Sequence, residues 1–459
     1  MHVILRAPRS AFTAFLASGL ATIFAAYVST QAGAQIGLGL VLVAFVFLVV
    51  LGGFLFWPHV TVALVVPVFA LIPMAKVFVG PWVGPLKDII SLAAIAAGVL
   101  LLAVNRHRPR GDSLILGAIG LLVALYVFNV AGPHNIAWLQ GVRLASVPLL
   151  LLGVGMTLDR PRRTLNWAIG SLVATACFVA TYGLLQQYLG RWRLRDLGYS
   201  FSLQLRDFHG YLRSFGTLDD PFAYAALLLF AFAAVVFWMK PKPLVKFAGV
   251  LITAGIVVSF VRSAILIGIA LIGLWLAREG KGAAASLLLA SAVVLATIIL
   301  GTATAQESRS YQTSNSIVTL NGRVGAWEIA LGKPSDWPFG QGVGEIGTAA
   351  QRATYSIVPR AGQALPDSAK AVDSGYLATI ADIGFFGLFV LLVLFGRIVA
   401  ISLPAIRNHQ RSGWLAVSLL AVIMLDAVTR SSFTGFPTAS LSFLLIGFAL
   451  AAARETETT

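Results

Sequence analysis

The stretch 375–401, GYLATIADIGFFGLFVLLVLFGRIVAI, decides the fold class of this 459-residue chain. Its apolar residues run on without alternation, and only Asp382 and Arg397 carry charge. A helix that spans a bilayer needs about 20 predominantly apolar residues, whereas a strand of a membrane barrel shows about ten residues of alternating polarity. The stretch therefore predicts a membrane-spanning helix.

Similar runs fill most of the chain, which is 58% hydrophobic and 11% charged. Soluble domains carry about 25% charged residues. The sequence therefore predicts an all-α polytopic membrane protein with twelve to fourteen transmembrane helices. The predicted spans lie near 11–30, 36–56, 58–75, 86–104, 113–131, 139–157, 164–189, 221–239, 244–260, 263–277, 283–300, 375–401, 413–429 and 434–453.

Lysines and arginines in short loops indicate orientation, because cytoplasmic loops are enriched in them. Seventeen of the 33 cations fall in alternate connections and at the two ends of the chain. This pattern predicts that both termini are cytoplasmic. The seventeen residues are Arg6, Arg9, Arg106, Arg108, Arg110, Arg160, Arg162, Arg163, Lys240, Lys242, Lys246, Arg278, Lys281, Arg397, Arg407, Arg411 and Arg454.

A mostly polar segment at 301–374 separates the spans 1–300 from the spans and cytoplasmic C-terminus at 375–459. Connections longer than about 15 residues are uncommon unless they are functional or disordered. The topology places this segment on the outer side of the membrane, as one large, partly helical loop. The remaining cations concentrate in this loop, in the basic outer loop at 190–220 and at Arg262. A basic outer surface predicts an anionic partner, and the simpler alternative is that loops of any kind hold charges.

Other classes of function find little support. Cys177 is the single cysteine, and the six histidines are scattered without the spacing of metal ligands. The formal net charge of +15 suggests nucleic acid, but topology alone explains about half of the cations. No metal, cofactor or nucleic-acid partner is therefore predicted.

Arg262 lies between two short apolar segments, at an outer turn. A guanidinium there could grip phosphate oxygens in bidentate fashion, or it could only mark the boundary of the bilayer. The segment 321–332 predicts a short amphipathic helix in which Arg323 and Trp327 are neighbours four residues apart. The alternative is a surface helix with Trp327 at the membrane interface.

Two further segments of the large loop have both a structural and a functional interpretation. Residues 338–344, PFGQGVG, predict a turn, although spaced glycines can also present N–H groups to an anion. Asp373 and Ser374 open the next span, where a carboxylate can cap the helix or act as a general base. Asp382 is a further carboxylate inside the span, so it must be paired or hydrated.

The loop at 190–220 closes with Arg213-Ser-Phe-Gly-Thr-Leu-Asp-Asp-Pro221. Asp220 and Pro221 suit the cap and the first turn of the following helix. Arg143 lies in the outer half of a span, and Asp426 and Arg430 have the spacing of an ion pair on one helix.

Four of these stretches, in order, resemble motifs of the O-antigen ligase and O-antigen polymerase family, glycosyltransferases of the bacterial inner membrane. Residues 213–221 resemble its Arg-x-x-Gly-Thr-x-x-x-Pro entry to a span, and 262–266 fit an Arg-x-x-x-Leu motif. Arg323 to Trp327 and Gly340 to Gly344 resemble its Arg-x-x-x-Trp helix and Gly-x-Gly turn. Asp373-Ser374, followed by Gly384-Phe-Phe-Gly387, fits the ligase pattern His-Asn/Ser/Gln-x9-Gly-x-x-Gly, with aspartate in place of histidine.

The resemblance implies metal-independent transfer of a glycan from undecaprenyl diphosphate to a sugar hydroxyl at the periplasmic face. Arg262 and Arg323 would act on the donor diphosphate, and Asp373 would activate or position the acceptor. Substrate binding would fall to Arg143, Arg213, Ser374 and Trp327. Besides the donor, the acceptor and membrane lipids, a chain-length regulator or export proteins would be partners.

The aspartate at 373 weakens the likeness to ligases and favours polymerisation of exopolysaccharide, capsule or O-antigen repeats. Ligation to lipid A-core stays open as an alternative. A transporter or flippase of an anionic or lipid-linked substrate, which would use the same arginines without breaking a bond, is the alternative from another class.

Overall fold

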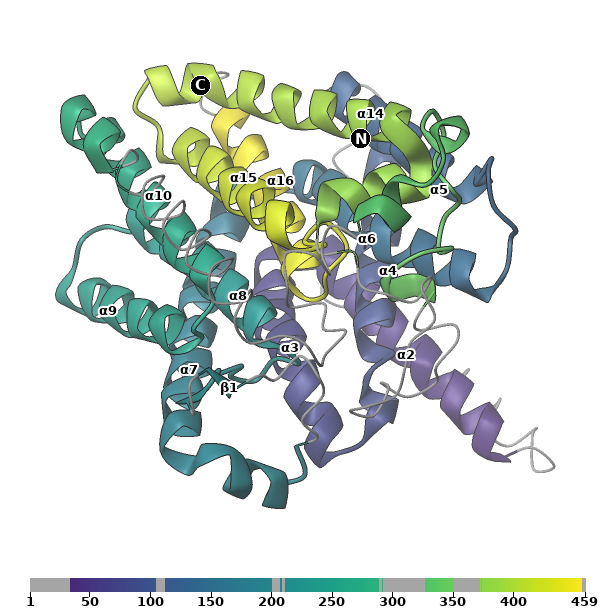
Figure 1. Ribbon diagram of the computed structural model, residues 1–459, viewed down its shortest axis with the longest axis horizontal. Coiled ribbons are helices and arrows are strands. Elements are labelled where there is room, and N and C mark those ends of the chain that lie inside the picture. The colour runs from purple at the N-terminus through teal and green to yellow at the C-terminus, as the bar shows by residue number, and fades with distance from the viewer. Residues whose placement is uncertain are drawn as a thin grey trace.

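The computed structural model describes residues 34–104, 112–199, 207–208, 211–288, 291, 327–350, 372 and 374–455. In these ranges the chain forms a bundle of α-helices (Figure 1). Seven of the described helices are long and apolar enough to cross a membrane. The prediction of an all-α polytopic membrane protein is therefore confirmed.

Twelve of the predicted spans coincide with helices of the described part of the chain. The span at 11–30 and most of 283–300 lie outside it. The described residues also form a two-residue antiparallel hairpin, β1 (Asp207–Phe208) with β2 (Tyr211–Leu212), and the short 3-10 helices η2 (Pro81–Val83) and η3 (Pro334–Asp336). The twelve helices are α2 (Ala34–Phe56), α3 (Pro58–Phe78), α4 (Leu86–Val104), α5 (Ser113–Phe128), α6 (Ile136–Thr157), α7 (Pro161–Asp196), α8 (Pro221–Phe237), α9 (Pro243–Val258), α10 (Arg262–Arg278), α14 (Gly375–Arg407), α15 (Arg411–Thr429) and α16 (Thr438–Glu455).

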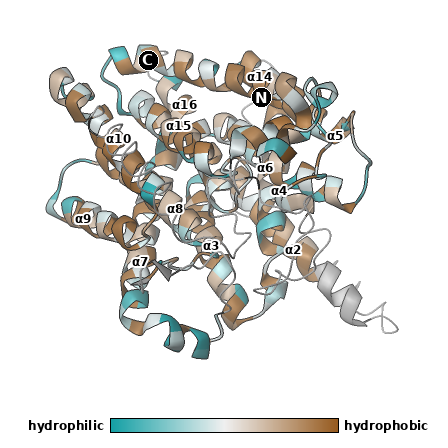
Figure 2. Ribbon diagram, viewed as in Figure 1, coloured by the Kyte–Doolittle hydropathy of each residue, from teal (hydrophilic) through white to brown (hydrophobic). Residues whose placement is uncertain are grey.

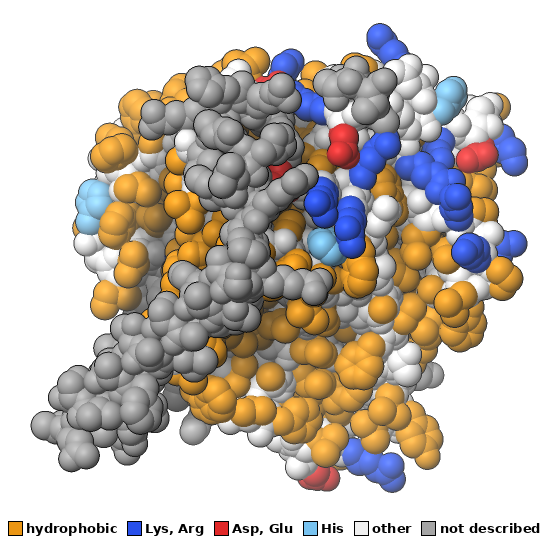
Figure 3. Space-filling view, turned by 180° about the vertical axis from the view of Figure 1, so that it is seen from behind, with side chains coloured by type: hydrophobic (Ala, Val, Ile, Leu, Met, Phe, Trp, Pro, Cys, Tyr) orange, Lys and Arg blue, Asp and Glu red, His pale blue; other side chains and the backbone are white. Residues whose placement is uncertain are grey.

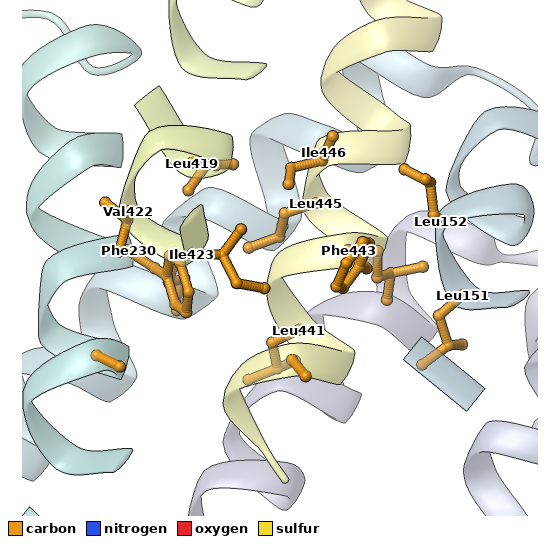
Figure 4. Close-up of a cluster of buried hydrophobic side chains, with 14 of the residues drawn as sticks. Leu151, Leu152, Phe230, Leu419, Val422, Ile423, Leu441, Phe443, Leu445 and Ile446 are labelled. Carbon is orange, nitrogen blue, oxygen red and sulfur yellow. The ribbon is translucent and has the colours of Figure 1, made fainter. Parts of the chain in front are cut away.

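Helix α16 forms the centre of the bundle. Of its most apolar 18-residue window, 89% is buried inside the protein, and it packs against α6, α7, α8, α14 and α15. Figure 4 shows Phe443 of α16 near Leu151 and Leu152 of α6, with Ile423 of α15 on the other side. At the crossing with α6, a Cβ on Gly155 would lie 2.9 Å from the Cα of Gly447. Small residues thus let the two backbones approach closely, as is common between membrane helices.

The hydropathy of the surface matches a bilayer environment. Hydrophobic residues cover most of the length of the helices, and hydrophilic residues lie mainly at helix ends, clearly so at the end of α7 (Figure 2). Exposed large apolar side chains such as Leu64, Phe178 and Phe389 are 62%, 52% and 62% accessible. Water would penalise such exposure, whereas lipid chains would cover it.

The helix ends divide into two groups that agree with the predicted alternation. One group, which we call the site end, contains the C-terminal ends of α3, α5, α7, α9 and α15. It also contains the N-terminal ends of α4, α6, α8, α10, α14 and α16. Contacts across it include Lys76–Asp219, Arg143–Asp88, Asp220–Arg430, Ser214–Val258, Asn129–Val343 and Ser374–Ala427.

The opposite group, the basic end, holds the described cations that the sequence assigns to the cytoplasm. Arg397 and Arg454 both pair with Asp112 there, and Arg411 donates to the carbonyl of Trp238. Seen from behind, lysine and arginine side chains gather over the upper right, above a band of hydrophobic side chains (Figure 3). That the basic end faces the cytoplasm stays a prediction.

Asp112 ties three helices together at the basic end. It caps α5 by accepting from the N–H groups of Leu114 and Ile115, and it lies 2.8 Å from Arg397 of α14 and 2.6 Å from Arg454 of α16. The hydrogen bond from Arg397 holds the pKa of Asp112 well below its usual range, although burial acts in the opposite direction.

Asp112→Asn should lower the stability of the protein at neutral pH by about 1–2 kcal/mol, because the asparagine can still cap α5 but loses its charge. A depressed folded pKa contributes stability that is fully present above the unfolded value, near 3.9, and is lost as pH falls through the folded value. The difference in thermal midpoint between wild type and variant should therefore shrink below about pH 4. A difference that stays constant down to pH 3 would contradict this assignment.

Candidate functional site

The segment 213–221 is held at the site end by the fully buried side chain of Gln186 on α7. The Oε1 atom of Gln186 accepts from the N–H groups of Phe215 and Gly216 at 3.0 and 2.9 Å, and its Nε2 donates to the carbonyl of Gly216 at 2.8 Å. One side chain thus satisfies three backbone groups of the segment. Gln187 adds a hydrogen bond to the carbonyl of Leu212.

Gln186→Leu should remove these three hydrogen bonds while keeping most of the volume of the side chain. Three backbone groups would lose their partner, and a buried unsatisfied group costs about 1–3 kcal/mol, so we expect a loss of roughly 2–4 kcal/mol. The measurement is the thermal midpoint of the purified protein in detergent. Thr181→Ala is the matched control, since Thr181 is exposed on the same helix and bonds only to the carbonyl of Cys177. Equal midpoints for the two variants would show that these hydrogen bonds are not stabilising.

The predicted cap at the end of this segment is confirmed. Asp220 is the N-cap of α8 and accepts from the N–H of Ala223 at 2.7 Å, and Pro221 begins the helix. The predicted pair of Asp426 and Arg430 is also confirmed, at 3.6 Å. Arg430 lies 3.8 Å from Asp220 as well, so it connects the segment 213–221 to the end of α15.

Arg262 lies in the turn from α9 to α10, beside the same segment. It is the first residue of α10, and its side chain is exposed. The N–H of Ser214 donates to the carbonyl of Val258 at 3.1 Å, at the end of α9. The first two stretches of the family resemblance, although 49 positions apart at their arginines, are therefore neighbours.

The glycine-rich segment 338–344 is a turn, as predicted, and four of its N–H groups donate hydrogen bonds within the protein. Gly340 donates to the carbonyl of Asp336 and Gln341 to the carbonyl of Ala381. Val343 donates to Asn129 Oδ1 at 2.6 Å, and Gly344 donates to Asp382 Oδ1 at 3.2 Å. These four N–H groups therefore support a structural role for the turn rather than an anion cradle.

This turn packs into a break in helix α14. Gly384 has φ 73° and ψ −176°, which interrupts the helix, and the N–H of Phe385 donates to the carbonyl of Trp337 at 2.7 Å. A Cβ on Gly340 would lie 2.6 Å from the carbonyl oxygen of Ala381, so the two backbones touch. The Gly340–Gly344 part of the third stretch and the Gly384–Gly387 part of the fourth thus pack together.

Ser374 is the N-cap of α14. Ser374 is 5% accessible, accepts from the N–H of Leu377 at 3.5 Å and donates to the carbonyl of Ala427. This buried capping role leaves its hydroxyl engaged with the protein. Trp327 lies in a helical segment described over 327–331 and is 37% accessible. Asp373 and Arg323 lie outside the described residues, as does the first half of the predicted helix at 321–332.

Arg143 lies on α6 at the edge of a pocket of the site end. Its Nη1 atom is 3.2 Å from Asp88 Oδ2, and the pocket is also lined by Lys87, Ser91 and Thr434. Lys87 lies 4.6 Å above the ring of Phe436. A second pocket shares Leu144 and Thr434 with the first and is lined by Asp382. The two pockets are therefore contiguous.

Sequence reasoning missed Gln186, Lys87 and Asp88. Gln186 lies in an apolar run, where a buried amide is a signal that could have been followed. Lys87 and Asp88 fall at the start of a span and look like ordinary boundary residues. Among the described residues, no three His, Cys, Asp or Glu side chains lie together as a metal site would require.

Comparison of the chain with protein-family models gives no match, and comparison with curated proteins gives none either.

Proposed function

We propose that this protein is a membrane glycosyltransferase that moves a glycan from undecaprenyl diphosphate to a sugar hydroxyl, at the periplasmic face of the bacterial inner membrane. The observation that carries the proposal is the convergence of the motif stretches on the site end. Residues 213–221 adjoin the turn before Arg262, and residues 340–344 pack against the break at Gly384.

Electrostatics support an anionic donor at this end. Arg143, Arg213 and Arg262 come from separate elements of the site end. Guanidinium groups bind phosphate oxygens well and stabilise the charge that develops on a departing diphosphate. Arg323, which belongs to the large loop, is proposed to act with them. In the proposed step, the acceptor oxygen attacks the anomeric carbon, the bond from that carbon to the diphosphate oxygen breaks, and undecaprenyl diphosphate leaves.

The break in α14 weighs against the transporter alternative. Discontinuous membrane helices in transporters offer their free backbone groups to substrate or ions. At Gly384 the neighbouring groups are instead occupied by the loop, since Ala381 accepts from Gln341 and Phe385 donates to Trp337. The break in α14 therefore anchors the large loop to the helix, which favours a fixed site over a transport pathway.

Polymerisation is preferred to ligation because Asp373 stands where ligases have histidine. The deciding experiment incubates the purified protein with a lipid-diphosphate-linked repeat, with and without lipid A-core. A ladder on lipid supports a polymerase, transfer to lipid A-core supports a ligase, and the absence of any new glycosidic bond overturns the proposed function.

A further inference from the structure

Asp382 of α14 is a carboxylate near the site end to which the family resemblance assigns no role. Asp382 is the eighth residue of α14, so it lies about 10 Å along the helix from its first residue. An ionisable residue within a membrane helix is costly and marks a functional site by default. Asp382 accepts a hydrogen bond from the N–H of Gly344 at 3.2 Å, and it forms no ion pair among the described residues.

Asp382 borders a small pocket of mixed polarity between α6, the 346–349 segment and the turn after α15. Thr348, Ser431 and Thr434 supply hydroxyl groups to its lining. Its volume is about 40 Å³, enough for two or three water molecules or for one hydroxymethyl group. A carboxylate among hydroxyl groups suits hydrogen bonding to a sugar, whereas a lipid chain would leave these groups unsatisfied.

The position of the pocket relates it to the cationic residues of the site end. It adjoins the pocket of Lys87 and Arg143 through Leu144 and Thr434, and the turn that includes Ser431 follows Arg430, which pairs with Asp220. A ligand that places phosphate against the arginines can therefore present a neighbouring sugar to Asp382.

We propose that Asp382 binds the acceptor sugar hydroxyl and takes its proton as the glycosidic bond forms, which rests on the proposed function. The hydroxyl oxygen bonds to the anomeric carbon, its proton moves to the Asp382 carboxylate, and the diphosphate departs with the electron pair of the broken bond. Asp373, at the start of the same helix, then positions the acceptor. The alternative is that Asp382 has only a structural role, in which it accepts the hydrogen bond from the N–H of Gly344.

Asp382→Asn separates these two roles, because the amide oxygen can still accept from the N–H of Gly344 while the side chain can no longer take a proton. We expect kcat for transfer to fall by about 10²–10⁴-fold, with little change in KM for the lipid-linked donor. Purified variants in lipid nanodiscs would be assayed for new glycosidic bonds by mass spectrometry. The carboxylate variant Asp382→Glu should recover part of kcat, whereas a purely structural role predicts wild-type kcat in Asp382→Asn.

Glu328→Gln is the matched control, since it removes an exposed carboxylate from the large loop. It should leave kcat unchanged. Wild-type kcat in Asp382→Asn overturns the role of Asp382 while the glycosyltransferase function stands. Loss of kcat in Asp373→Asn but not in Asp382→Asn assigns the proton transfer to Asp373 instead. A wild-type protein that forms no glycosidic bond overturns the proposed function, and the role of Asp382 with it.

Discussion

Arg262→Ala should lower the rate of glycan transfer by about 10²–10³-fold, the usual cost of losing one preorganised donor to developing charge. Arg262 is exposed at the first turn of α10, so its removal leaves the buried packing of that helix, through Ala264 and Ile267, in place. The measurement is polymer or transfer product per mole of protein, with membrane insertion and protein level checked in parallel. Arg323→Ala should have a similar effect.

Two variants sharpen this test. Arg262→Lys keeps the charge but not the planar fork, so it should retain only part of the activity. Arg162→Ala is the matched control, because Arg162 is an exposed arginine near the start of α7, at the basic end. Normal product from Arg262→Ala would remove this residue from any role in binding the diphosphate.

Gly384→Ala should destabilise the protein by roughly 2–4 kcal/mol, although it adds only one methyl group. The residue has φ 73°, a conformation that favours glycine, and a Cβ there would overlap the carbonyl oxygen of Pro338. Because the clash is with the backbone of the large loop at Pro338 and Phe339, relief requires this part of the loop to move away from α14. Transfer activity should fall together with stability.

Gly396→Ala provides the comparison within the same helix. A Cβ on Gly396 meets nothing within 4 Å, and its backbone is helical, so alanine should be neutral or raise stability by about 0.5–1 kcal/mol. Cys177 is the single cysteine and is half-buried, so thermal unfolding can be followed with a thiol-reactive dye. Similar midpoints for the two alanine variants would show that the break does not depend on glycine.

The positions of the membrane-spanning helices could be predicted from sequence because each of them is a continuous apolar run. The capping role of Asp220 was predictable for a similar reason, since it depends only on neighbours in sequence. The break at Gly384 was not, because a glycine in an apolar run looks the same whether the helix continues or stops. The contacts of Gln186 and Asp112 were not predictable either, because their partners are distant in sequence. Gly216 is 30 positions from Gln186, and Arg454 is 342 positions from Asp112.

The candidate site was predictable to a lesser degree. Spacing and resemblance selected Arg262, and the structure places its turn beside the segment that carries Arg213. The pocket of Asp382 could not be predicted, because its lining comes from α6, the large loop, α14 and the turn after α15. Side chains from four elements meet only when the bundle is assembled.

The central position of α16 has a consequence for biosynthesis. The helices against which it packs, α6, α7, α8, α14 and α15, all precede it in the chain, and its mean hydropathy of 1.3 is the lowest of the seven long apolar helices. The five helices that bury α16 are therefore translated before it, and the faces that they turn toward α16 are covered only once α16 itself is inserted.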